Sequence, residues 1–132
     1  MLKVNTIVKG DKLVEFLANL DKENLAIVVI SDELREYLKG APWSDSIAPI
    51  TTLDEVDKEL CRRVSLMRTH NATLYSRLPD DARPPRMLII LEGWTNKERN
   101  LLRVSRACGI SYVLPTSDIT EDMRSFFENI IT

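Results

Sequence analysis

Glu92 is the residue of this sequence best placed to do chemistry. It directly follows an apolar run that predicts a strand over 86–91, and a predicted helix (95–108) and strand (110–115) come after it. A carboxylate at the end of a strand can activate a water molecule or hold a metal ion. The position before it is Leu91, so no second acid stands beside Glu92 in the sequence. The sequence therefore poses the question whether Glu92 serves an active site or is left over from one.

Cysteine and histidine contents argue against other metal chemistry. The sequence has one histidine, His70, and two cysteines, Cys61 and Cys108, with no Cys-x-x-Cys or Cys/His spacing. A structural zinc site usually needs four such ligands, so we predict no metal. We expect the cysteines to be reduced and packed on helices of a cytoplasmic protein, and His70 to lie in a surface loop.

The elements that must position Glu92 alternate between apolar strands and amphipathic helices. Strands are predicted over 2–8, 25–31, 86–91 and 110–115, with a short one at 47–50. Helices are predicted over 11–20, 32–40, from 52 onward, 95–108 and 119–130. Asp32 is expected to cap the second helix, and Thr52 with Glu55 fits a capping box for the third.

This alternation predicts an α/β fold in which a mostly parallel sheet lies between two layers of helices. With 132 residues, no linker and no internal repeat, the chain is expected to form a single domain over 1–132. Ligands of such sheets bind beyond the carboxyl ends of the strands. The residues expected along that edge are Lys9, Gly10, Ser31, Glu92, Gly93, Thr116 and Ser117.

Five segments of the sequence together resemble one known family. They are AIVVISDELREY, ELCRRVSLM, NATLY, RPPRMLIILEGW and RVSRACGISYVLPTSDIT, in this order between residues 25 and 123. They are similar to segments of the motor domain of FtsK/SpoIIIE-type translocases. The resemblance implies a truncated RecA-like, P-loop-NTPase-like three-layer αβα sandwich. It also implies descent from hexameric ATPases that move DNA, or secretion substrates in the EssC-like type VII branch, with Glu92 as the Walker B acid.

The phosphate-binding loop of that family is missing from its expected place. A P-loop reads G-x-x-x-x-G-K-[ST], because its backbone N–H groups wrap the phosphates, its lysine reaches their oxygens and its hydroxyl binds Mg²⁺. Here the junction is VKGDKL. It offers Lys9, Gly10 and Lys12 as a remnant, with Asp11 to repel phosphate and Leu13 in place of the hydroxyl.

Two further parts of the nucleotide site depart from the family pattern. Leu91 stands where the metal-holding aspartate is expected, and Ser117 and Asp118 replace the Gln-Arg strand end that senses the γ-phosphate. Without these groups Mg²⁺ and the transferring phosphate lose their protein contacts. We therefore expect no ATP turnover, no cofactor and no confident catalytic residue, with Glu92 as a remnant acid.

Charge is distributed unevenly along the chain. Residues 62–106 hold 10 Lys or Arg against 4 Asp or Glu, although the whole chain has a net charge of −2. Such a segment can contact phosphates or an acidic subunit, or it can be a solvated helix face. The candidate contact residues for nucleic acid or a neighbouring subunit are Arg62, Arg63, Arg99, Arg103 and Arg106.

The resulting hypothesis is a non-hydrolysing motor shell that assembles with, or regulates, a DNA- or protein-translocating machine. It would bind a protein partner or its own copies, touch DNA weakly and in a salt-dependent way, and not insert into a membrane, since no apolar run approaches the roughly 20 residues needed. One alternative is an adaptor protein that docks through Trp43 and Trp94. Another is a small-molecule enzyme that uses Glu92 as a general base.

Overall fold

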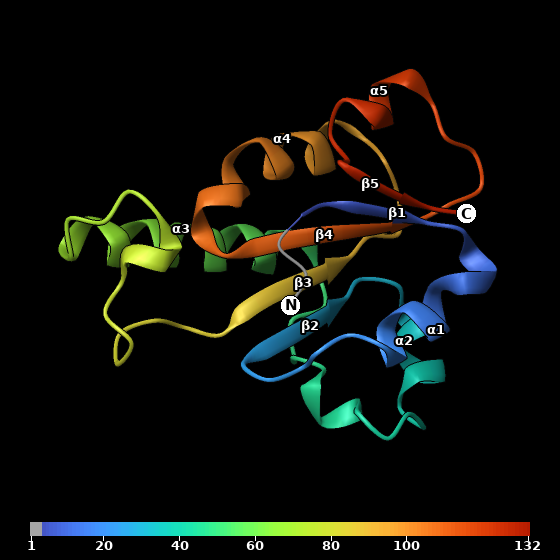
Figure 1. Cartoon of the computed structure of the whole chain (residues 1–132), viewed down its shortest axis with the longest axis horizontal. Coiled ribbons are helices and arrows are strands. Elements are labelled where there is room, and N and C mark those ends of the chain that lie inside the picture. The colour runs from blue at the N-terminus through green and yellow to red at the C-terminus, as the bar shows by residue number, and fades with distance from the viewer. Residues whose placement is uncertain (1–3) are drawn as a thin grey trace.

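The computed structural model describes residues 4–132, in which five parallel strands form one sheet (Figure 1). The strands are β1 (Thr6–Val8), β2 (Leu25–Val29), β3 (Arg86–Ile90), β4 (Ile110–Pro115) and β5 (Asn129–Ile131). Their order across the sheet is β2-β3-β4-β1-β5. The prediction of a mostly parallel α/β sheet is confirmed, while part of the strand predicted over 2–8 lies outside the described residues.

Helices cover both faces of this sheet (Figure 1). They are α1 (Leu13–Ala18), α2 (Asp32–Leu38), α3 (Leu53–Thr69), α4 (Asn96–Ser105) and the single turn α5 (Glu121–Arg124). Buried side chains of α1 and α2 join one core, and those of α3 and α4 join a second core on the opposite face. The strands alternate between the two: on β3, Leu88 and Ile90 belong to the first core and Ile89 to the second. The three-layer sandwich is therefore present.

Hydroxyl side chains begin the longer helices. The Thr52 hydroxyl accepts a hydrogen bond from the Glu55 N–H at 3.2 Å, which is the first half of the predicted capping box. The second half differs, because the Glu55 carboxylate accepts from the Thr51 N–H at 3.2 Å and not from that of Thr52. At α4, Thr95 and Glu98 form a complete capping box that the sequence reading did not identify. The prediction that Asp32 caps α2 is wrong. Ser31 is the cap, because its backbone is still extended and its hydroxyl accepts from the Leu34 N–H.

The predicted helix over 119–130 is also wrong. Only α5 is helical, and the chain then turns and adds β5 to the sheet beside β1, with Ile130 opposite Ile7. The apolar spacing of this segment suits a helix. Pairing with β1 and the burial of Phe127 against the α4 side of the sheet outweigh that local preference.

The outer side of β2 is partly covered. The short strand predicted at 47–50 is reduced to a single parallel bridge between Ile47 and Ile27, in which the Ala48 N–H donates to the Ile27 carbonyl at 2.8 Å. Within the described part of the chain, no helix has the length and apolar character needed to cross a membrane.

Candidate functional site

The carboxyl ends of the strands bring the predicted edge residues into one row. Lys9 and Gly10 follow β1, Thr116 follows β4, and Glu92 follows β3 after one further residue. Strand β4 lies between β1 and β3. Since neighbouring strands are about 4.8 Å apart, the ends of β1 and β3 lie about 10 Å from each other. The backbone thus retains the frame of a ligand-binding edge.

Backbone donors of the β1–α1 junction are already engaged. The Lys9 N–H donates to the Ile131 carbonyl at 2.9 Å, and the Lys12 N–H to the Lys9 carbonyl at 2.8 Å. The Leu13 N–H donates to the Gly10 carbonyl. Residues 10–12 form a tight 3-10 turn that leads directly into α1. A phosphate cradle requires such N–H groups to point freely at the ligand, so this turn cannot supply these three.

Leu13 and Leu91 stand at the two positions where the sequence resemblance predicted metal ligands to be missing. Leu13 is 4% exposed and packs in the core under α1 and α2, while Leu91 is 2% exposed and packs in the core under α3 and α4. Leu91 continues the alternation of β3, and its N–H donates to the Val113 carbonyl at 2.8 Å. Both side chains therefore contribute to folding and lie away from solvent.

Glu92 itself is exposed, and its carboxylate has no hydrogen bond or ion pair with any residue of the described range 4–132. The buried acid of this segment is instead Glu98, which is 6% exposed and whose carboxylate accepts from the Thr95 N–H at 2.6 Å. Glu98 thus serves the start of α4. No group of three or more His, Cys, Asp or Glu side chains in residues 4–132 is arranged to hold a metal ion.

Solved structures with this arrangement of strands include the cytoplasmic domain of EssC. That match has a TM-score of 0.63 and 12% identity over 98% of the present chain. The fold is similar to that of the EssC ATPase domains. EssC ATPases 2 and 3 from Geobacillus thermodenitrificans match with a TM-score of 0.58 and 12% identity over 98% of the chain. The pCW3 conjugation coupling protein TcpA, solved as a monomer with ATPγS, matches with a TM-score of 0.62 and 17% identity over 94%.

The likeness confirms the motor-type fold expected from the sequence. The present chain spans 32%, 33% and 47% of these three structures, so it corresponds to a part of each. No protein-family model and no curated protein matches the sequence. At identities this low the shared feature is the fold, and any function must be argued from the residues of this chain.

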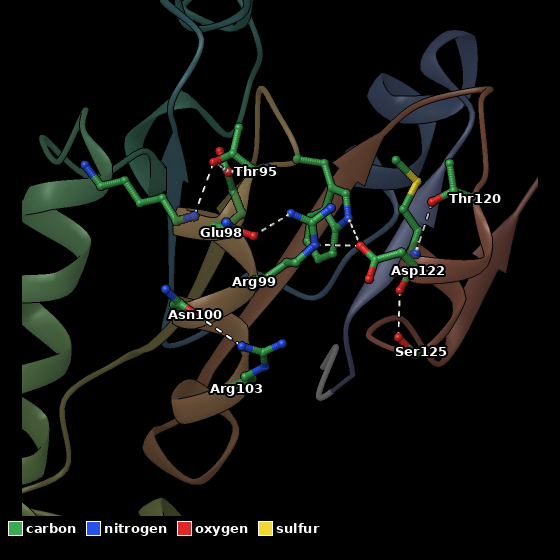
Figure 2. A network of polar contacts seen from close by, with 12 residues as sticks. Thr95, Glu98, Arg99, Asn100, Arg103, Thr120, Asp122 and Ser125 are labelled. Atoms are coloured by element: carbon green, nitrogen blue, oxygen red, sulfur yellow. Dashed lines mark hydrogen bonds and ion pairs between the residues drawn. The ribbon is translucent and has the colours of Figure 1, made fainter.

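Three arginines form a basic row, with Arg99 and Arg103 on α4 and Arg106 in the 3-10 turn that follows it. Figure 2 shows Arg99 of this row facing Asp122 in the chain's own C-terminal segment. The Arg99 Nε lies 2.6 Å from Asp122 Oδ2, and the indole N–H of Trp94 donates to the same oxygen at 2.8 Å. Arg106 forms an ion pair with Glu128. The Arg99 guanidinium and the Trp94 N–H hold the pKa of Asp122 below its usual value. Arginines of the basic segment 62–106 therefore neutralise two acids of the C-terminal segment, Asp122 and Glu128.

Arg103, the third arginine of the row, has no carboxylate partner among residues 4–132. Its guanidinium carbon lies 5.4 Å from the centre of the Phe126 ring, and its Nη1 donates to the Asn100 side chain at 3.2 Å. Arg103 remains exposed, and the side chain of Arg106 is 63% exposed despite its ion pair. Parts of the row can therefore still be reached from solvent.

Arg62 and Arg63, neighbours in sequence, lie in opposite environments. The Arg62 side chain is 71% exposed and pairs with Glu59. Arg63 is 3% exposed, and its guanidinium donates to the carbonyls of Cys108 at 3.0 Å and Pro85 at 2.5 Å. Burial lowers the pKa of Arg63 below its usual value, with the Glu59 carboxylate acting in the other direction.

This burial corrects the expectation that Arg63 contacts a nucleic acid or another subunit. The apolar stripe of α3 is wide enough to include position 63, and backbone carbonyls of two other segments satisfy the charge there. Arg63 thus ties α3 to the loops before β3 and β4. A run of two arginines gives no signal in the sequence that one of them is internal.

The two tryptophans are also used within the fold. Trp94 is half-buried, with its ring centre 5.2 Å from those of both Phe126 and Phe127. Trp43 is half-buried against the other core, with the Lys22 ammonium 5.3 Å from its ring centre. The adaptor hypothesis required both rings to form an exposed docking surface, and neither is fully exposed.

The two free cysteines have different environments. Cys108 is buried as expected, but Cys61 is exposed on α3.

Proposed function

We propose that this chain is a non-hydrolysing motor-shell domain that acts in the assembly or regulation of a DNA- or protein-translocating machine. The observation that carries the proposal is the placement of Leu13 and Leu91, which occupy the expected Mg²⁺-ligand positions as core residues. A missing ligand on an exposed loop could be replaced by a neighbour or by water. Two ligand positions built into the hydrophobic cores cannot be used without disrupting the packing.

The retained parts of the fold support a role in packing against other motor domains. The sheet, the helices on both faces and the caps of α3 and α4 are intact, although the phosphate-binding junction is reduced to one 3-10 turn. One matched structure contains two EssC ATPase units, and the present chain spans 33% of it. A chain of this size and fold suits a place beside active domains, or beside its own copies, in a cytoplasmic assembly.

Nucleic-acid or subunit contact forms a second part of the proposal. The accessible members of the basic set are Arg62, Arg103 and Arg106, with Arg99 held by Asp122. Contacts of these residues with phosphates would be weak, independent of base sequence and lost as salt concentration rises. If DNA causes no mobility shift even at low salt, contact with nucleic acid is excluded, and the same arginines are then proposed to contact a protein.

An ATP hydrolysis assay tests the central part of this proposal. We expect the purified chain to show no Mg²⁺-dependent release of phosphate above a buffer control. Turnover that requires Mg²⁺ and is abolished in Glu92→Gln would contradict the proposal, since it would make Glu92 a working catalytic acid. The same substitution tests the small-molecule enzyme hypothesis, for which the exposed Glu92 carboxylate has no second catalytic group within hydrogen-bond distance in residues 4–132.

Sedimentation equilibrium tests the assembly role. A self-associating shell predicts a weight-average mass that rises with protein concentration above the 15.1 kDa of one chain. A constant monomer mass assigns the interface to a different partner, which co-purification with an intact motor domain from the same genome would reveal. Failure of both experiments would contradict a role in assembly.

A further inference from the structure

A polar cavity of about 470 Å³ lies at the amino edge of the sheet, where β2 and β3 begin. This region is at the left of Figure 1, beyond the start of the yellow strand β3. Its lining includes Asn24, Tyr75, Asp80, Arg83 and Arg86. The volume lies within the range of small-molecule sites. The cavity is at the opposite edge from Glu92 and is independent of the motor-type nucleotide site.

Tyr75 organises this cavity. The residue is 7% exposed, and its hydroxyl donates to the Pro84 carbonyl. Three guanidinium groups approach its ring, with their central carbons at 4.7 Å for Arg86, 5.7 Å for Arg83 and 5.8 Å for Arg63. The negative face of an aromatic ring attracts cations, but one ring does not neutralise three of them.

The three arginines differ in how their charges are satisfied. Arg63 has the Glu59 carboxylate at 3.6 Å and backbone carbonyls as acceptors for its Nη groups, although its Nε is buried without a hydrogen-bond partner. Arg83 has Asp80 at 3.2 Å and the Leu78 carbonyl at 2.7 Å, but its Nε is buried without a hydrogen-bond partner. The Arg86 guanidinium has no carboxylate or carbonyl acceptor among residues 4–132.

Arg86 is therefore a half-buried cation in a cavity with its donors unused. The nearest carboxylate of the lining, Asp80, is 96% exposed and already lies beside Arg83, so water screens most of its charge. A planar guanidinium matches two oxygens of a phosphate or carboxylate in parallel hydrogen bonds. Phosphate fits two neighbouring arginines better, because it carries more acceptor oxygens and up to two charges.

We propose that this cavity binds a phosphate group through the Arg86 guanidinium, with Arg83 as the second cation. The group can come from a free phosphate or pyrophosphate, or from the phosphodiester backbone of a single-stranded nucleic acid. This site does not depend on the motor-shell function. The site can exist in an active or an inactive protein, so the outcomes of the ATPase and assembly experiments do not decide whether it binds phosphate.

Isothermal titration with inorganic phosphate, at an ionic strength held constant with sodium chloride, tests the site. We expect saturable binding by the wild-type chain and at least about tenfold weaker binding by Arg86→Gln, the loss expected for a charge-assisted hydrogen-bond pair. Arg77→Gln is the matched control, because it removes the same charge from an exposed residue that does not line the cavity. Arg86→Lys keeps the charge but lacks the planar guanidinium, so its affinity for phosphate should lie between that of the wild type and that of Arg86→Gln.

A short single-stranded oligonucleotide and pyrophosphate, titrated in parallel, distinguish the sources. Tighter binding of the oligonucleotide that is lost in Arg86→Gln assigns the site to nucleic acid, and binding of the free anions alone assigns it to a small ligand. The proposal is overturned if phosphate shows no saturable binding, or if Arg86→Gln and Arg77→Gln weaken binding equally. Thermal unfolding of each variant verifies its folding, and Arg86→Lys decides the test if Arg86→Gln does not fold.

Discussion

The two edges of the sheet use opposite chemistry. At the carboxyl edge, Leu13 and Leu91 belong to the hydrophobic cores, and Glu92, the acid that follows β3, is exposed without a partner in residues 4–132. At the amino edge, arginines converge on the buried ring of Tyr75. Ligands of open α/β sheets usually bind at the carboxyl edge. This chain has a fold similar to that of ATPase domains, but its cluster of arginines around Tyr75 lies at the other edge, so a shared fold does not fix where a site lies.

The largest effect is expected for Leu91→Asp, which introduces the aspartate that the sequence resemblance leads one to expect at this position. The carboxylate would be buried in the core under α3 and α4 without a cation, so we expect the free energy of unfolding to fall by at least about 4 kcal/mol. Urea unfolding followed by circular dichroism measures the change. Glu92→Gln, at the exposed neighbour, should change stability by less than about 0.5 kcal/mol. A stable Leu91→Asp variant that gains Mg²⁺-dependent ATP binding would show that this edge is a site with one ligand missing.

At the amino edge, Arg63→Ala should cost about 3 kcal/mol of unfolding free energy. The substitution removes a buried guanidinium and leaves the carbonyls of Cys108 and Pro85 without donors. The neighbouring Arg62→Ala is the control, since an exposed ion pair contributes at most about 1 kcal/mol. Equal losses for the two variants would mean that Arg63 does not link α3 to the loops before β3 and β4.

Two glycines, one near each edge, sharpen the comparison further. Gly109 has a φ of +75°, and a Cβ there would lie 2.7 Å from a Tyr75 ring carbon, so Gly109→Ala should cost about 2 kcal/mol and displace Tyr75. Gly10 has no atom within 4 Å of an added Cβ, so Gly10→Ala should change stability by less than about 0.5 kcal/mol. Thermal unfolding of both variants checks this. A strongly destabilised Gly10→Ala would indicate that the β1–α1 junction needs a glycine, as a phosphate-binding loop does.

The smallest effect is expected for Asp122→Asn, which removes the anion between Arg99 and Trp94. Arg99 and Trp94 lower the pKa of Asp122 in the folded chain. A lowered pKa stabilises the fold above the pKa of the unfolded chain, about 3.9 for aspartate, and this stabilisation disappears as the pH falls below it. Wild type should therefore exceed Asp122→Asn in stability at pH 7, and the difference should shrink below about pH 4. Urea unfolding at both pH values measures the stability difference between the two proteins. A difference that does not change with pH would mean that the Asp122 carboxylate does not cause it.

Much of the fold could be predicted from the sequence because its strongest patterns are local. The strand predicted over 110–115 coincides with β4, and the helix predicted over 95–108 corresponds to α4 and the 3-10 turn after it. Strands that are apolar on both faces indicate burial by two layers of helices. The prediction of a helix over 119–130 was wrong because the conformation of this segment depends on pairing with β1 and on contact with the Trp94 ring, both of which are distant in sequence.

The candidate sites were predictable only in part. The sequence shows that Leu13 and Leu91 stand where polar groups were expected at the carboxyl edge. Only the structure shows that these two leucines are buried in separate cores. Arg63 and Arg62 have the same side chain, so the sequence could not indicate which of them is internal. The Tyr75 cavity was missed because Asn24, Tyr75 and Arg86 come from three segments that only the tertiary fold brings together.

Amide shift mapping with Mg²⁺–ATP tests the contrast between the two edges most directly. A ¹⁵N-labelled chain should show saturable shift changes, caused by the triphosphate, around Tyr75 and Arg86, and these changes should be absent in Arg86→Gln. The amides of Lys9 to Leu13 and of Glu92 should stay at their positions with and without Mg²⁺. Saturable, Mg²⁺-dependent changes at Lys9 to Leu13 and Glu92 would contradict the account and restore the carboxyl edge as a nucleotide site.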